Sequence, residues 1–149
     1  MANLEQIQKL REETSASMAD VKKALDEAKG DEVKALELLR ERGKIIAAKK
    51  SLREASDGLI FSYLHTNGKV GVLLELKCET DFVAKTDEFN ILGKDLCMHI
   101  TAMKSENVAE LLEQPFVKNQ DKKVSDLIIG VIAKVGENVA VGRFVRYEI

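Results

Sequence analysis

The chain has 149 residues, of which 45% are hydrophobic and 32% are charged. This balance is typical of a globular protein and argues against a disordered or membrane-spanning chain. The 23 basic and 25 acidic residues give a net charge of −2, so no overall positive charge favours nucleic acid. No apolar run approaches the roughly 20 residues that span a bilayer, and the first residues lack a signal-peptide pattern. We therefore expect a cytoplasmic protein with no membrane contact and no direct nucleic-acid partner.

Residues 3–43 have the periodicity of three short helices. Ser17 and Asp31 are candidate N-caps, and Gly43 is placed to end the third helix in a left-handed conformation. Such a bundle lies at the lower size limit for independent folding, so it either binds a partner or covers an edge of a larger domain. The residues expected to face inward are Leu4, Ile7 and Leu10, then Met18, Val21, Leu25 and Ala28, then Val33, Leu36 and Leu39.

Residues 44–57 are rich in alanine and basic residues, which indicates a helical or extended linker. Its cations are Lys44, Lys49, Lys50 and Arg53. Four cations without interleaved aromatic residues are a weak signal for nucleic acid, so a solvated linker is the favoured interpretation.

Residues 58–149 predict an α+β domain in which helices back an antiparallel sheet. It opens with two β-rich runs on either side of Asn67-Gly68, a strong hairpin signal. Phe89 begins an apolar stripe that predicts a helix to about Lys104. A short helix within 105–113 is expected to follow.

A polar loop is then expected over residues 114–121, followed by a helix with Ser125 as candidate cap and Gly136 as its end. Residues 138–149 alternate and predict a third strand, with a bulge near Gly142. We expect one side of this strand to carry Val139, Val141, Val145, Tyr147 and Ile149, and the other Phe144, Arg146 and Glu148. A three-stranded sheet with helices on one face leaves the other face open, so we expect a homodimer to cover it.

The residue types needed for catalysis are scarce. Cys78 and Cys97 lie far apart without a second pair, which favours buried, reduced thiols. His99 lies beside an apolar stripe with no partner at a ligand spacing and is expected to be packed rather than catalytic. No phosphate loop or metal motif is present, so we predict a binding protein with no catalytic residue, metal or cofactor.

One corner stands out, where the apolar run 70–76 gives way to helical periodicity. Thr80 is a candidate N-cap, and Asp81 and Phe82 would project from the first turn, where the helix dipole favours the carboxylate. Phe82 and Phe89 are seven residues apart, so periodicity alone places both on one helix face and favours a core position. The alternative is that Phe82 contacts a partner.

The corner sequence, Thr80-Asp81-Phe82-Val83-Ala84-Lys85 followed by Phe89, resembles the signature of the elongation factor Ts family of translation factors, the guanine-nucleotide exchange factors of the GTPase elongation factor Tu. Nearly the whole chain shares the resemblance. Its further motifs are 10–14, 18–25 (Met-Ala-Asp-Val-Lys-Lys-Ala-Leu), 47–50, 98–100, 112–117 and 132–138.

The resemblance implies a ubiquitin-associated-like domain over residues 1–43, a linker over 44–57 and an exchange and dimerisation domain over 58–149. It implies that Thr80, Asp81, Phe82 and Val83 form a wedge that enters elongation factor Tu near its magnesium and phosphate site. The amino-terminal residues that it implies as contacts are Leu10, Arg11, Met18, Lys22 and Lys23.

The segment 101–113 is shorter than family members are expected to have, which makes this a compact form, and the single copy of the core resembles short forms that pair as homodimers. Two other functions stay open. One is an adaptor that binds its partner through the bundle, with the α+β domain as an oligomerising scaffold; the other is RNA binding through residues 44–53.

Overall fold

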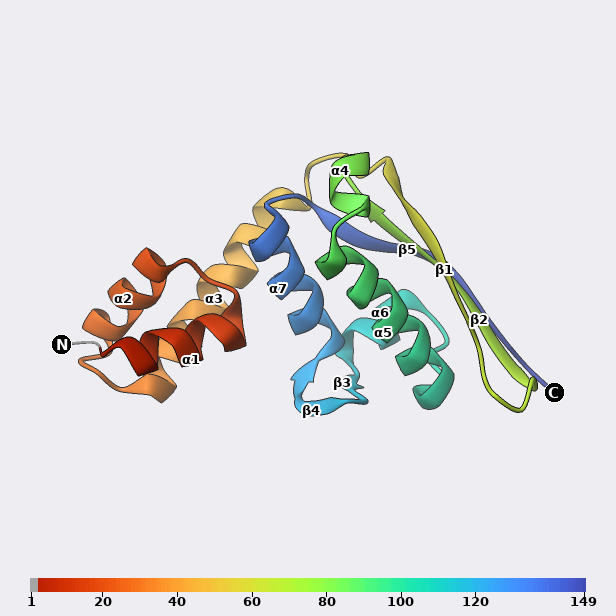
Figure 1. Cartoon of the computed structure of the whole chain (residues 1–149), viewed down its shortest axis with the longest axis horizontal. Helices are drawn as coiled ribbons and strands as arrows, with labels where there is room; N and C mark the ends of the chain where they lie inside the picture. The colour runs from red at the N-terminus through yellow and green to blue at the C-terminus, as the bar shows by residue number, and fades with distance from the viewer. Residues whose placement is uncertain (1–2) are drawn as a thin grey trace.

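The computed structural model describes residues 3–149, and within them it has the predicted α+β architecture (Figure 1). An amino-terminal bundle of three helices lies on one side of the molecule and a three-stranded antiparallel sheet on the other, with the helices that pack on the sheet between them. The elements in chain order are α1 (Leu4–Thr14), α2 (Met18–Glu27), α3 (Glu32–Lys50), β1 (Asp57–Leu64), β2 (Val70–Cys78), α4 (Asp81–Ala84), α5 (Asp87–Met103), α6 (Val108–Glu113), β3 (Pro115–Phe116), β4 (Asn119–Lys123), α7 (Val124–Val135) and β5 (Val139–Glu148).

The bundle has its own buried cluster. Ser17 and Asp31 cap α2 and α3 as predicted, because their side-chain oxygens accept backbone N–H groups of the first turn. Leu4, Met18 and Val33 were expected to face inward, yet they are exposed; all three lie in the first turn of their helices, where the helix end meets solvent. The buried residues are Ile7, Leu10, Val21, Ala24, Leu25, Ala28, Ala35 and Leu39.

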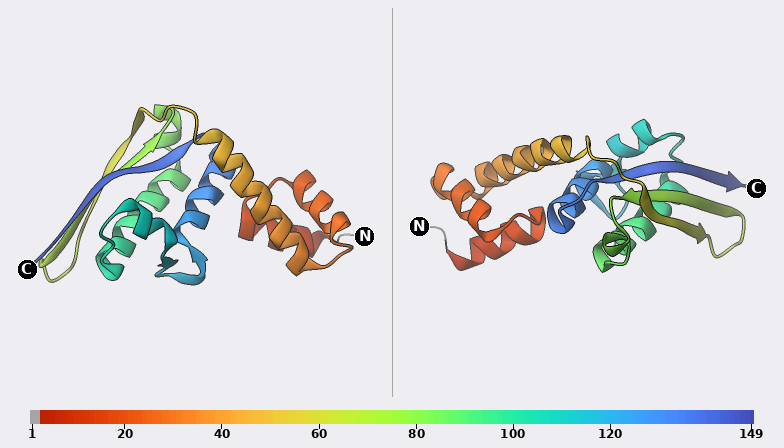
Figure 2. Two further views of the ribbon diagram at one scale, coloured as in Figure 1. Left: turned by 180° about the vertical axis from the view of Figure 1, so that it is seen from behind. Right: turned by 90° about the horizontal axis from the view of Figure 1, so that it is seen from above.

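Helix α3 joins the two parts of the molecule. The prediction that Gly43 ends this helix is wrong, because α3 continues to Lys50. Gly43 instead allows close approach to α7: a Cβ at this position would lie 3.2 Å from Cγ2 of Ile129. Ala47, one turn further, packs against the core of the α+β part. The residues between α3 and β1 are therefore fewer than the predicted linker 44–57, and views from two further directions show α3 beside α7 (Figure 2).

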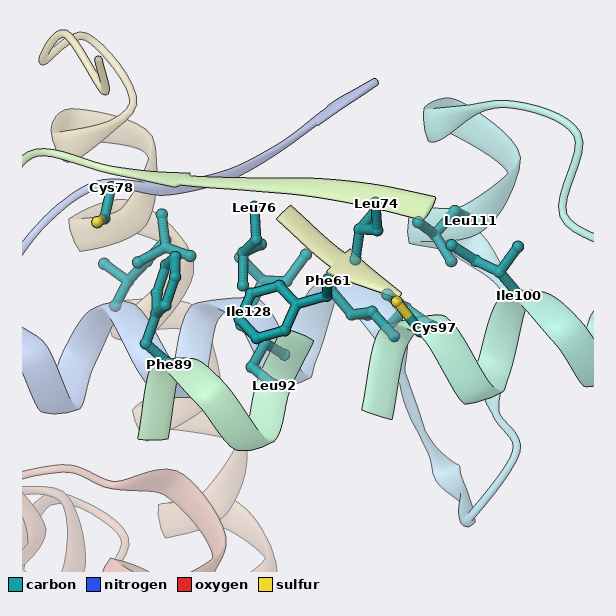
Figure 3. Close-up of a cluster of buried hydrophobic side chains, with 14 of the residues drawn as sticks. Phe61, Leu74, Leu76, Cys78, Phe89, Leu92, Cys97, Ile100, Leu111 and Ile128 are labelled. Carbon is teal, nitrogen blue, oxygen red and sulfur yellow. The ribbon is translucent and has the colours of Figure 1, made fainter. Parts of the chain in front are cut away.

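The sheet has the order β1-β2-β5 with antiparallel neighbours. The turn between β1 and β2 is the predicted hairpin turn: Gly68 has a φ of 72°, and the Lys69 amide donates to the side chain of Asn67 at 3.0 Å. Helices α5, α6 and α7 pack against one face of this sheet, and Phe61 projects from β1 between β2 and α5 (Figure 3). The prediction of a one-sided sheet is confirmed.

A β-bulge in β5 corrects the predicted faces of that strand. Leu76 pairs with Val141, but Leu74 pairs with Phe144, so β5 carries one extra residue opposite Glu75. The extra residue reverses the alternation: Val141 and Phe144 both pack on the helical side, whereas Val145 and Tyr147 face the open side. The bulge predicted near Gly142 is present. The predicted faces are wrong beyond it, because the extra residue shifts the alternation of side chains by one position.

Two further local predictions are wrong. The segment 114–121, expected as a loop, forms most of the small hairpin β3–β4. Helix α7 is preceded by Lys123, not capped by Ser125: the Lys123 amide donates to the carboxylate of Asp126 at 3.0 Å. The Asp126 side chain thus satisfies a donor just before the helix, so α7 begins at Val124. Gly136 ends α7 as predicted, with a φ of 77°.

The open face of the sheet carries a group of exposed apolar side chains. It presents Ile60, Leu64, Leu73, Val145 and Tyr147, all exposed. Next to them, both the backbone amide and Nε of Arg143 donate to Oε1 of Glu75, at 3.0 and 2.6 Å, which holds the bulge and lowers the pKa of the Glu75 carboxyl. No helix within residues 3–149 is long and apolar enough to cross a membrane.

Candidate partner-binding site

The corner between β2 and α4 is the most exposed aromatic feature of the α+β part. Thr80 caps α4, since its hydroxyl accepts the Val83 amide at 3.4 Å. Asp81 and Phe82 follow at the first two helical positions, and the Phe82 side chain is 78% exposed. An exposed aromatic ring beside an exposed carboxylate forms a tip that offers both an apolar surface and a negative charge.

Helix α4 ends before α5 begins, and this break separates the two phenylalanines. The Thr86 hydroxyl donates to the Val83 carbonyl at 2.7 Å and accepts the Phe89 amide at 3.3 Å, so it closes α4 and caps α5. Asn90 donates to the carbonyls of Ala84 and Thr86 at 2.9 and 2.8 Å. Phe89 is fully buried, against Phe61 at a ring distance of 6.0 Å. The expectation from seven-residue spacing that Phe82 and Phe89 share a face is therefore wrong.

The turn before α4 is bound to the turn between α7 and β5. Oε1 of Glu137 accepts the backbone amides of Glu79 and Thr80 at 3.1 and 3.0 Å, and Oε2 accepts the Thr80 hydroxyl at 2.7 Å. Glu79 reciprocates by accepting the Asn138 amide at 2.7 Å. These bonds connect residues about sixty positions apart and hold the corner on the body of the domain.

Cys78, which is buried at the end of β2, makes a hydrogen bond to the turn of the corner. Burial raises the pKa of the Cys78 thiol, and the carboxylates of Glu137 and Asp57 raise it further. The thiol is therefore protonated at neutral pH and donates to the Thr80 carbonyl at 3.1 Å. Cys97 is also buried, which raises its pKa to about 11. Both thiols are free and packed, as the sequence predicted.

The residues implied as partner contacts divide by exposure. Thr80, Asp81 and Phe82 are exposed at the corner, but Val83 is 3% exposed and packs in the core beneath it. In the bundle, Arg11, Met18, Lys22 and Lys23 are exposed, whereas Leu10 is 1% exposed. Val83 and Leu10 thus support the two surfaces from inside.

A groove lies between α7 and the part of the bundle formed by α1 and the loop that follows it. Its walls include Arg11 and Glu12 near the end of α1, the loop 15–17, and Lys134 of α7. Lys134 lies 3.4 Å from the carboxylate of Glu88 in the first turn of α5. The groove and this ion pair therefore connect Arg11 of the bundle with the helix that follows the corner.

Sequence reasoning missed the residues that anchor the corner. Glu79, Glu137 and Asn138 were not selected as site residues, although the segment 132–138 was part of the resemblance. Their role depends on contacts between distant segments, so no local pattern could reveal it. His99 is packed as predicted, buried between Gln114 and the backbone of Val117.

Within residues 3–149 no group of three or more histidine, cysteine, aspartate or glutamate side chains is placed to hold a metal ion. The corner presents two protruding side chains, those of Asp81 and Phe82, on a turn that is held by hydrogen bonds to Glu137.

Comparison with known proteins gives a consistent result. The family model described as elongation factor TS matches residues 79–149, which begin at the corner. The elongation factor Ts of Carboxydothermus hydrogenoformans is 41% identical to this chain in an alignment that covers 100% of this chain and 89% of the relative. The elongation factor Ts of Rubrobacter xylanophilus is 42% identical over 98% of both chains, and that of Fervidobacterium nodosum 43% over 96% of this chain and 95% of its own.

The fold, the corner and these relatives place the protein in the class of translation elongation factors. More narrowly, the chain belongs to the elongation factor Ts family. The alignment with the Carboxydothermus protein extends over 194 positions for a chain of 149 residues, so that relative carries residues that this chain lacks. This agrees with the compact form predicted from the sequence.

Proposed function

We propose that this protein is a guanine-nucleotide exchange factor that binds elongation factor Tu in its GDP form and promotes GDP release. The observation that carries the proposal is the corner: Phe82 is 78% exposed, and Thr80, Glu79 and Glu137 hold the turn that carries it. A large aromatic ring that protrudes from a turn held by hydrogen bonds is the kind of side chain that acts as an anchor in an interface. In this proposal a surface of elongation factor Tu receives the ring.

The mechanism is insertion rather than covalent chemistry. Magnesium and the phosphate loop of a GTPase together hold the phosphates of its nucleotide. A phenylalanine and a carboxylate that enter beside these elements displace them and weaken nucleotide binding. Linkage requires that the nucleotide weaken binding of the factor by the same ratio, so the factor binds, GDP leaves, and incoming nucleotide releases the factor.

The amino-terminal bundle supplies a second contact in this proposal. Its exposed Arg11, Met18, Lys22 and Lys23 provide apolar and basic side chains for this contact, and Arg11 also lines the groove next to α7. Two contacts on one molecule raise affinity because the second forms at high effective concentration. The bundle thus gives affinity while the corner gives exchange.

We also propose that the open face of the sheet pairs with a second copy of the chain. Its five exposed apolar residues, named above, lie on all three strands. The register places Leu73 beside Val145, so the apolar surface is continuous across β2 and β5. An isologous contact of this kind buries the same patch on both subunits.

Release of a fluorescent GDP analogue from purified elongation factor Tu tests the exchange function. The wild-type protein is expected to accelerate release, and Phe82→Ala to slow the catalysed release by about 10-fold or more, because an anchor residue of this type commonly contributes 2 kcal/mol or more to an interface. Leu52→Ala removes another exposed apolar side chain, 89% exposed, and should leave release unchanged.

Two results would contradict the proposal. If saturating wild-type protein does not accelerate release, the exchange function is wrong and the adaptor hypothesis becomes the better one. If release is accelerated but Phe82→Ala is fully active, the exchange function stands and the assignment of the corner is wrong.

A further inference from the structure

We propose that Glu137 is the positioning residue of the exchange corner and that, with Glu79 and Asn138, it ties the corner to the chain leaving the amino-terminal bundle. The inference rests on the proposed exchange function and extends it to residues outside the corner itself.

Both carboxylate oxygens of Glu137 are bound to the two residues that precede Asp81. One oxygen receives two backbone amides, from Glu79 and Thr80, and the other receives the Thr80 hydroxyl. Hydrogen bonds to an ionised carboxylate are shorter and stronger than neutral ones. The planar carboxylate therefore fixes both the backbone and the side chain of the turn.

The Thr80 hydroxyl has a single proton, which it donates to Glu137 at 2.7 Å. Its lone pair is then directed to the Val83 amide, which it accepts at 3.4 Å. Glu137 thus orients the cap of α4. This matters because α4 has only four residues, Asp81–Ala84, too few to be stable through their own backbone bonds.

The reciprocal bonds extend the connection to the bundle. Glu79 accepts the Asn138 amide, and the Asn138 side chain donates to the Arg53 carbonyl at 2.8 Å. Asn138 is 6% exposed, and the Arg53 guanidinium lies 3.7 Å from the Glu79 carboxylate. Arg53 belongs to the short segment between α3 and β1. The corner, the α7–β5 turn and the exit from the bundle are therefore bound to one another.

Phe82 has little packing of its own to restrain it, since most of its side chain is exposed. Its direction relative to the domain is set by the turn, and the turn by Glu137. Misplacement of an inserting group by about 1 Å costs on the order of 100-fold in a reaction that depends on orientation. Loss of Glu137 should therefore reduce exchange through Phe82 without removing it from the surface.

Hydrogen exchange of the free protein provides the first test and needs no GTPase. In Glu137→Ala the amides of Glu79 and Thr80 should exchange at least ~10-fold faster, because they lose their only side-chain acceptor. Unchanged exchange at both amides overturns the inference. Glu137→Gln keeps an acceptor for the amides but not for the Thr80 hydroxyl, so it should lie between the wild type and Glu137→Ala.

GDP release from elongation factor Tu provides the second test. Glu137→Ala should slow catalysed release by ~10-fold or more, while in a Phe82→Ala background the same change should cost less than about twofold, because the two act through one contact. Additive losses indicate a general structural effect and overturn the inference. Glu113→Ala removes an exposed carboxylate, paired with Lys123 at 2.9 Å, and serves as the matched control with normal release.

The two tests separate the inference from the function on which it rests. If the wild type fails to accelerate release, the proposed function is wrong, and hydrogen exchange still decides whether Glu137 holds the turn. If Glu137→Ala proves unfolded, the isosteric Glu137→Gln carries both measurements, and wild-type behaviour of that variant in both overturns the inference.

Discussion

Phe82 and Phe89 lie seven positions apart and have opposite environments. Phe89 fills the core between the sheet and α5, whereas Phe82 projects into solvent. The residue that separates them is Thr86, whose hydroxyl ends one helix and begins the next. The Thr86 hydroxyl thus separates the two rings: Phe82 stays exposed, whereas Phe89 is buried and stabilises the fold.

His99 is a second residue whose environment determines its behaviour. Its Nδ1 accepts the Val117 amide at 3.1 Å, so the ring proton lies on Nε2, which donates to Oε1 of Gln114 at 2.9 Å. Phe116 stacks on the ring at 5.8 Å. A second ring proton would point at the Val117 amide. Burial lowers the pKa of His99, and the Gln114 bond opposes this shift only in part.

We expect stability to fall as pH drops below about 6.5, the ordinary pKa of histidine. The unfolded chain then takes up a proton that the folded His99 resists, so unfolding becomes easier by at most about 1.4 kcal/mol per pH unit until the folded pKa is reached. Urea unfolding at pH 7.5 and 5.5 measures this. His99→Gln retains the exposed His65 but should lose part of the dependence; an identical dependence in both proteins would contradict the assignment.

At the scale of elements, the packing distance between helix and sheet depends on small residues. Gly93 of α5 is buried against the ring of Phe61 in β1, and a Cβ at this position would overlap the ring. Gly43 likewise allows α3 and α7 to pack closely. Both glycines have ordinary helical conformations, so their purpose is close approach rather than a left-handed turn.

Gly93→Ala should therefore lower the free energy of unfolding by about 1–3 kcal/mol, the usual cost of overpacking a core. Gly130 of α7 is the matched control, because no atom lies within 4 Å of the Cβ that alanine would add. Gly130→Ala should raise the free energy of unfolding by about 0.5–1 kcal/mol through helix propensity. Denaturant unfolding of both variants measures the difference, and equal effects would refute the proposed close contact at Gly93.

At the scale of the whole molecule, two hydrophobic clusters are joined by one helix. The amino-terminal half of α3 packs in the bundle, and Ala47 in its other half packs on the α+β core. The corner and the open sheet face are separate surfaces, because one lies at the end of β2 and the other along the side of the strands away from the helices (Figure 1). We therefore expect the proposed pairing through the sheet to leave Phe82 exposed.

Light scattering should give a mass that approaches twice that of the monomer as protein concentration rises. Leu73→Lys places a charge at the middle of the apolar face, where burial without a partner is costly, and should shift the protein to a monomer. Leu52→Lys changes an exposed residue outside this face and should leave the dimer intact. A wild-type protein that stays monomeric at every concentration would disprove the pairing. The monomeric Leu73→Lys should still accelerate GDP release.

Local rules in the sequence predicted much of the fold. Apolar periodicity located the main helices and strands, Asn67-Gly68 the hairpin turn, and Asp31 and Thr80 the helix starts, because each depends on interactions within a few residues. The local pattern also predicted the corner with Asp81 and Phe82 in its first turn; that these residues contact a partner was implied by the family resemblance and stays a prediction. These features depend on interactions between residues that are close in the sequence, so the sequence alone is sufficient to predict them.

Only the tertiary structure decided the features that depend on distant contacts. Gly43 continues a helix because Ile129 lies against it, and β5 changes face because one extra residue lies opposite Glu75. The anchoring of the corner joins Glu137 to Glu79 and Thr80 across 58 and 57 positions. Hydrogen bonds and packing between segments so far apart exist only once the chain has folded, which is why the sequence located the tip and the structure revealed what holds it.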